Sequence, residues 1–117
     1  MKETFIESLE FTEWVKAYFP DDDLASVQRE LMADTDRGDV MPGCGGLRKL
    51  RVADPRRGKG KRGGARVIYL HVPEVDQIHL ITVYGKDQKD DLSAEDKARY
   101  RQLVRILKSQ SRRSRGT

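Results

Sequence analysis

A dense group of cationic side chains in the middle of the chain defines the chemistry that this sequence can support. Residues 48–66 contain nine Lys and Arg residues and a single acid, Asp54. The cations are Arg48, Lys49, Arg51, Arg56, Arg57, Lys59, Lys61, Arg62 and Arg66. Segments typical of β-strands flank this group, RKLRV before it and ARVIYLHV after it. Because a positive loop held between two strands favours a polyphosphate ligand, we expect RNA or DNA as the partner.

The apolar pattern predicts the elements that hold this loop. Residues 4–7 read as a strand, and two helices follow over 10–18 and from 21–23 to near 38. A three-stranded antiparallel meander is expected over 47–53, 65–72 and 77–85, and a last helix starts at the Ser93 cap. The order β-α-α-β-β-β-α predicts an α+β fold with a mainly antiparallel sheet packed by helices. We expect one domain over residues 1–108 and a flexible basic tail over 109–117.

Alternation along the meander assigns side chains to the two faces of the sheet. In the last strand, Ile81 and Val83 are expected on one face and Thr82 on the other. Because antiparallel strands place the end of one beside the start of the next, polar residues at these ends should meet. They are Lys49, Arg51, Arg66, Tyr84 and Lys86, with residues 59–62 looping over them.

The charge of the chain is divided between its two parts. Residues 1–40 carry eleven acids and four bases, whereas residues 41–117 carry eight acids and nineteen bases. This division indicates that one face meets a polyanion. The acidic helices between Glu7 and Asp36 could attract a basic partner protein, or they could be ordinary solvated surface.

Other classes of site find little support in the sequence. A single cysteine, Cys44, excludes an internal disulfide and a Cys-based zinc site. The acids and histidines lack ligand spacing, so we expect no metal and no cofactor. Residues 58–63 match the dinucleotide fingerprint G-x-G-x-x-G, but a strand follows where that motif requires a helix. Without an apolar signal segment or membrane span, we expect a cytoplasmic protein.

Three segments together resemble a known family. They are GGLRKLRV at 45–52, GKGKRGGARVIY at 58–69 and ITVYGK at 81–86. The chain is similar to the RelE/HigB toxins of bacterial type II toxin–antitoxin modules, and most similar to a HigB subgroup with a lysine- and glycine-rich loop. The resemblance covers nearly the whole chain up to about residue 108. It implies a RelE-like microbial-ribonuclease-type fold.

The resemblance also implies an activity and partners. Such toxins are ribosome-dependent endoribonucleases, or mRNA interferases, which enter the A site of the 30S subunit and cut the mRNA there. A cognate antitoxin neutralises them, and operator DNA is contacted only through the antitoxin.

By position, Lys49 and Arg51 match basic strand residues of the RelE site, Arg66 matches the family's strand arginine, and Lys86 matches the lysine after the last strand. Asp87 stands where RelE has an arginine. The catalytic tyrosine of RelE has no aligned counterpart, and Tyr84 could substitute for it.

Cleavage by the ribose 2′-OH needs a base, positive charge on the phosphorane and a proton for the leaving oxygen. Arg66 is our candidate for the phosphorane clamp, because its guanidinium matches phosphate oxygens in pairs. Lys61, Lys49 or Tyr84 could act as base or acid, since crowding with cations lowers the pKa of a lysine. Tyr84 could instead stack on a base or simply pack within the sheet. The remaining cations named above, with Lys86, are expected to bind RNA phosphates.

The two histidines, His71 and His79, lie well inside their strands, so we interpret both as structural. Two other functional classes stay open. One is a ParE-like toxin, which inhibits gyrase without chemistry but usually lacks so dense a basic group. The other is a nucleic-acid-binding module without catalysis.

Overall fold

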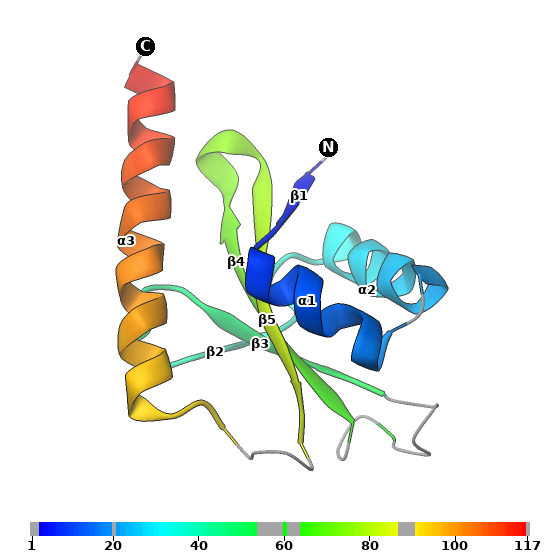
Figure 1. Cartoon of the computed structure of the whole chain (residues 1–117). Coiled ribbons are helices and arrows are strands. Elements are labelled where there is room, and N and C mark those ends of the chain that lie inside the picture. The colour runs from blue at the N-terminus through cyan, green and yellow to red at the C-terminus, as the bar shows by residue number, and fades with distance from the viewer. Residues whose placement is uncertain (1–2, 20, 54–59, 61–63, 87–90, 117) are drawn as a thin grey trace.

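The computed structural model describes residues 3–19, 21–53, 60, 64–86 and 91–116 of the chain, and it has an α+β fold. A five-stranded sheet has the strand order β1-β5-β4-β3-β2 (Figure 1). The strands are β1 (Thr4–Glu7), β2 (Asp39–Val40), β3 (Arg48–Val52), β4 (Ala65–Val72) and β5 (Gln77–Gly85). The helices are α1 (Leu9–Tyr18), α2 (Asp21–Ala33), α3 (Ala94–Gly116) and the short 3-10 helix η2 (Pro73–Val75).

The sheet is mainly antiparallel, as predicted. Strands β2 to β5 pair antiparallel with their neighbours, and β1 alone pairs parallel, with β5. In the sequence, α1 and α2 follow β1 and precede the other strands. β1 nevertheless pairs with β5, the last strand in the sequence. The two-residue strand β2, which the sequence did not predict, pairs with Arg48 and Lys49.

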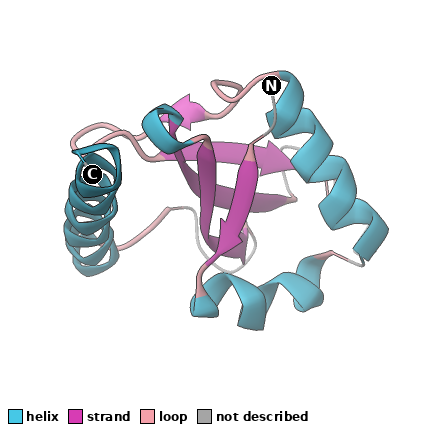
Figure 2. Ribbon diagram, turned by 90° about the horizontal axis from the view of Figure 1, so that it is seen from above, coloured by secondary structure: helices cyan, strands magenta, loops and turns pink. Residues whose placement is uncertain are grey.

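Each face of the sheet has its own hydrophobic core, because helices cover both faces (Figure 2). On one face, α1 and α2 contribute residues such as Phe11 and Leu31, which pack with Val67 of β4. On the other face, Tyr100 and Val104 of α3 pack with strand residues of that side. The alternation of β4 therefore divides its side chains between two buried layers.

A β-bulge in β5 changes the expected orientation of its side chains. The pairing shifts between Ile68 and Tyr69 of β4, so Ile81 of β5 is the additional residue. Ile81 joins the core on the α3 face, whereas Val83 belongs to the core on the α1–α2 face. The prediction that Ile81 and Val83 share a face is therefore wrong. The hydroxyl of Ser8, the N-cap of α1, donates to the Ile81 carbonyl at 2.6 Å.

Helix α3 differs from the prediction at its end. The sequence suggested a flexible tail after residue 108, but the helix continues to Gly116. No Gly or Pro interrupts residues 94–115, and Arg has good helix propensity. Ser111 is buried at 7% exposure, which shows that the helix still packs against the domain beyond residue 108. Within the described residues, no helix is both long and apolar enough to cross a bilayer.

Candidate functional site

Three strands bring the predicted cations together at one end of the sheet. The register places Arg51 opposite Arg66 and Arg66 opposite Tyr84, so these residues form a row across β3, β4 and β5. One step along, Lys49 lies opposite Ile68 on the same face. The backbone N–H of Lys86 donates to the Gly64 carbonyl at 2.9 Å, which holds the ends of β4 and β5 side by side.

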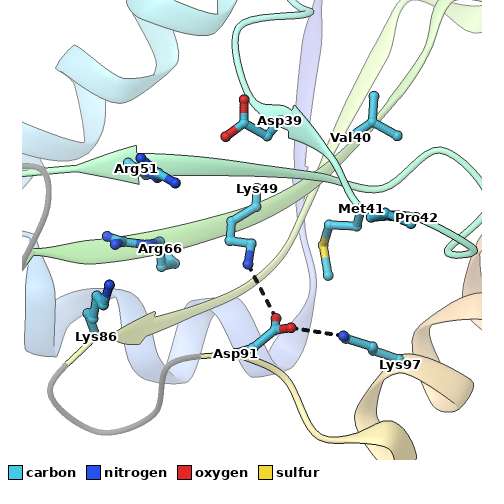
Figure 3. A pocket seen from close by; sticks show the side chains of 10 residues that line it. All are labelled: Asp39, Val40, Met41, Pro42, Lys49, Arg51, Arg66, Lys86, Asp91 and Lys97. Atoms are coloured by element: carbon cyan, nitrogen blue, oxygen red, sulfur yellow. Dashed lines mark hydrogen bonds and ion pairs between the residues drawn. The ribbon is translucent and has the colours of Figure 1, made fainter.

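Arg51 and Arg66 of this row, with Lys49 and Lys86, form one wall of a pocket (Figure 3). The lining residues come from β2 and the turn after it, from β3, β4 and the position just after β5, and from the start of α3 and the segment before it. They are Asp39, Val40, Met41, Pro42, Lys49, Arg51, Arg66, Lys86, Asp91 and Lys97. Five cations and two acids give a net charge of +3, because 5 − 2 = 3. The pocket is therefore suited to an anionic ligand.

Arg66 is the most buried cation of this site. It is only 4% exposed, and its Nη1 donates to the Ala65 carbonyl at 3.3 Å. Burial lowers the pKa of Arg66, and the positive charge of Arg51 acts in the same direction. An arginine nevertheless keeps its proton in proteins. The site thus holds a fixed positive charge in a poorly hydrated place, where it acts more strongly on a phosphate than it would in water.

Tyr84 lies beneath this wall rather than on the surface. The residue is 3% exposed and belongs to the core on the α3 face. Burial and the charge of Asp91 raise the pKa of Tyr84 to about 12, although Arg66 acts in the opposite direction. The phenol is therefore protonated at neutral pH and can donate a hydrogen bond, but it is a poor base. The buried ring leaves no free face for stacking on a nucleobase.

Asp91 and Lys97 complete the pocket, and neither was predicted from the sequence. Asp91 accepts hydrogen bonds from Lys97 Nζ at 2.8 Å and from Lys49 Nζ at 3.3 Å (Figure 3). The backbone N–H of Leu92 also donates to it, at 2.8 Å. The bond from Lys97 above all lowers the pKa of Asp91 to about 2. The one sequence signal that could have pointed to these residues is the Ser93 cap, which predicts that a helix begins close to both of them.

Arg48 is placed away from the pocket. Its Nη1 donates to the carbonyls of Asp36 and Gly38, at 3.1 and 2.8 Å, and its guanidinium pairs with the Asp36 carboxylate at 3.4 Å. Arg48 therefore fixes the turn between α2 and β2. The structure does not bring it together with the other predicted phosphate ligands.

Five predicted site residues lie outside the described residues. They are Arg56, Arg57, Lys59, Lys61 and Arg62. Apart from Gly60, the described part of the chain ends at Val52–Ala53 on one side of the loop and resumes at Gly64–Ala65 on the other, next to the Arg51–Arg66 pair.

The two histidines, which were interpreted as structural, lie outside the pocket. His71 pairs through Nε2 with the carboxylate of Glu3, and His79 contacts the Gln77 side chain at 3.0 Å. Burial lowers the pKa of His79, so its neutral form is favoured. Among the described residues, no three His, Cys, Asp or Glu side chains gather as metal ligands would.

Comparisons with known proteins agree with this architecture. The E. coli toxin RelE, in a mutant form in the free state, matches with a TM-score of 0.51 at 16% identity. The match covers 77% of this chain and 90% of that chain, and at this identity it shows the fold alone. The family described as "RelE toxin of RelE / RelB toxin-antitoxin system" matches residues 6–114, a range that includes every residue of the pocket. The chain therefore belongs to the RelE toxin family of toxin–antitoxin systems.

Proposed function

We propose that this chain is the toxin of a type II toxin–antitoxin module and cleaves mRNA as a ribosome-dependent endoribonuclease. It would act in the A site of the 30S subunit in the cytoplasm and so inhibit translation. The observation that carries this proposal is the row of Arg51 and buried Arg66, beside Lys49, in a pocket of net positive charge. Preorganised charge of this kind stabilises a phosphorane as negative charge develops on it.

The residues divide the reaction among them as follows. Arg66 binds the two non-bridging oxygens of the phosphorane, while Arg51 and Lys86 hold the flanking phosphates. Lys49 in β3 is a candidate for the proton transfer to or from the reacting oxygens. Lys61, which lies in the loop outside the described residues, is a second candidate. Tyr84, protonated beneath Arg66, supplies a hydrogen-bond donor. The proposed reaction draws its positive charge from side chains and uses no metal.

The proposal includes partners and a subgroup. A cognate antitoxin neutralises the toxin, and contacts with operator DNA pass through the antitoxin. The lysine- and glycine-rich segment over residues 58–66 supports a place in the HigB subgroup.

Expression of the chain in bacteria, with primer extension on a reporter mRNA, tests the proposal. The expected result is growth arrest, rescue by the co-expressed neighbouring gene, and new mRNA ends that appear only on translated messages. Arg66→Ala should reduce cleavage by about 10²-fold or more. Arg29→Gln, which removes an exposed cation from α2, is the matched control and should cleave normally.

Other results would identify the alternatives. Growth arrest with inhibited gyrase and intact mRNA would indicate a ParE-like toxin instead. Normal growth with nucleic-acid binding would indicate a non-catalytic module. Full killing by the Arg66→Ala, Lys61→Ala double variant would refute the assigned site.

A further inference from the structure

Helix α3 carries a row of cations that the cleavage site does not explain. From Lys97 to Arg115 the chain has eight Lys and Arg residues and no acid. Five of them recur at intervals of three or four residues, which places them along one side of the helix. They are Lys97, Arg101, Arg105, Lys108 and Arg112, called the basic row below. Its fifteen residue steps, at about 1.5 Å each, span about 22 Å.

Packing fixes the direction in which the basic row faces. Tyr100, Val104 and Ser111 of the same helix are buried at 4%, 3% and 7% exposure. They hold α3 against the sheet and η2, which leaves the basic row along the flank of the helix. The helix therefore presents its charges from a rigid element.

The cations of the basic row are available to a ligand. Arg105, Lys108 and Arg112 are exposed, and Arg101 is half-buried. Within the described part of the chain, Arg101, Arg105 and Arg112 make no ion pair, whereas Arg99 on another side of the helix pairs with Glu10 and Asp96.

The contacts of the basic row on the protein itself are few. Lys108 donates to the Gly45 carbonyl at 2.7 Å. Glu74 is the acid that lines the depression beside Lys108 and Arg112. Most of the positive charge along this flank is therefore uncompensated.

The basic row begins inside the pocket. Lys97 lines the pocket through its contact with Asp91, which raises the pKa of Lys97, and the charge of Arg101 in the next turn acts in the opposite direction. The basic row thus leads from the pocket along α3 towards η2. Figure 1 shows α3 running from the end of the sheet where β5 finishes to beyond the β4–β5 turn.

We propose that the basic row binds the sugar–phosphate backbone of the RNA strand where that strand leaves the pocket. The identity of the strand rests on the proposed function. A regular series of cations suits a polyanion better than a protein partner, because a protein partner would need several anchor residues and the described part of α3 exposes one large hydrophobic side chain, Ile106. Tyr100, the aromatic residue of α3, is buried, so a strand on this flank would be bound through its charge and not by stacking of its bases.

The test measures binding of uncleavable 2′-O-methyl RNA by fluorescence anisotropy over a range of salt. Oligonucleotides of about 4 and about 16 nucleotides bracket the site sizes of single-strand binders. The wild-type chain should bind the longer one more tightly and with a steeper salt dependence. The Arg101→Gln, Arg105→Gln, Arg112→Gln triple variant should lose about 2 units of that slope, at about 0.7 per phosphate contact. Its binding of the short oligonucleotide should change little.

Arg29→Gln is the control for charge alone, because it removes an exposed cation from α2. Gln and Arg are both good helix formers, so the triple variant should unfold at the wild-type temperature, which circular dichroism can check.

The proposal is wrong if the triple variant keeps the full slope on the long RNA, or if it loses affinity equally for both lengths. It is also wrong if the wild-type chain binds both lengths of RNA equally. Polyglutamate, an acidic polypeptide, stands in for a protein partner: a triple variant that loses binding of polyglutamate but keeps binding of RNA would also contradict the proposal. Failure of the nuclease proposal can be recognised separately. If the wild-type chain cleaves no mRNA but binds long RNA through the basic row, the nuclease proposal is wrong and the inference about the basic row still holds.

Discussion

The ammonium of Lys49 lies 3.3 Å from the carboxylate of Asp91 in the pocket. Lys97 reaches the other oxygen of the same carboxylate at 2.8 Å. Asp91 therefore occupies a position between two cations that a phosphate oxygen would also favour. It holds both lysines in the pocket while no RNA is bound, and it reduces the repulsion among the cations around it.

The Asp91→Asn variant should separate binding from chemistry. Loss of the carboxylate raises the net charge of the pocket by one unit, from +3 to +4, so RNA should bind more tightly and KM should fall. Lys49 loses the group that positions it, so kcat should fall by about tenfold to a hundredfold. Steady-state cleavage of translated mRNA measures both quantities. An unchanged kcat would show that Asp91 does not position Lys49.

The interactions of Asp91 with Lys49 and Lys97 should make the stability of the folded protein depend on pH in the acidic range. The pKa of Asp91 is lowered to about 2 from a usual value of 3.8. The unfolded chain therefore takes up this proton at a higher pH than the folded chain. The contribution is present above about pH 4 and is lost as the pH falls towards 2.

Thermal unfolding of wild type and Asp91→Asn between pH 7 and pH 2 measures this effect. The wild type should be more stable at neutral pH, by about 1 kcal/mol or less because the side chain is 45% exposed. The difference should close in acid, and a constant difference would contradict the linkage.

Tyr84→Phe tests the phenol as a hydrogen-bond donor beneath Arg66. The ring is 3% exposed, so the variant should keep the packing of the core. Cleavage should fall by about tenfold or more if the hydroxyl helps to stabilise the phosphorane. A variant that cleaves at the wild-type rate would assign Tyr84 to packing alone.

Tyr84 should also give the folded protein a dependence on alkaline pH. Its pKa is raised to about 12, so the folded state favours the neutral phenol. The stability that this provides is complete below pH 10 and is lost as the pH rises from 10 to 12. Unfolding of wild type and Tyr84→Phe across this range should show a smaller loss in the variant.

Gly38→Ala should disturb the strand that carries Lys49. A Cβ on Gly38 would lie 2.8 Å from a ring carbon of Tyr69 and 3.1 Å from the backbone carbonyl of Lys49. Tyr69 cannot move freely, because its hydroxyl accepts from the Gly38 N–H at 2.9 Å and donates to the Thr35 carbonyl at 2.7 Å.

We expect Gly38→Ala to lower the free energy of unfolding by about 1–3 kcal/mol and to reduce cleavage as well. Gly60→Ala, where an added Cβ would meet nothing within 4 Å, is the control and should be close to neutral. Urea unfolding compares the two, and equal stabilities would contradict the steric argument.

The strand part of the site could be predicted because it depends on local rules. The period of two placed Lys49 and Arg51 on one face, and antiparallel pairing brought Arg66 beside Arg51. These relationships need only the identity of neighbouring strands, which the turn-rich connections already indicate.

The remaining contacts depend on relationships that a pattern does not contain. Asp91 and Lys97 follow a connection whose path is set by packing of α3, and no periodicity relates them to β3. The bulge at Ile81 forms where Ser8, distant in the sequence, can satisfy the Ile81 carbonyl. Strand alternation gave Arg48 its face, but only the structure shows the Asp36 and Gly38 carbonyls that it binds there.

The position of Lys97 in the sequence affects when the pocket can form during synthesis. A polypeptide that has left the ribosome only as far as β4 contains Arg66, but it has neither β5 to pair with that strand nor α3 to cover its outer face. Asp91 and Lys97 emerge later still, from the last third of the sequence. The complete set of charges therefore exists only in a nearly finished chain, and a growing one carries its arginines without the geometry that makes them a site.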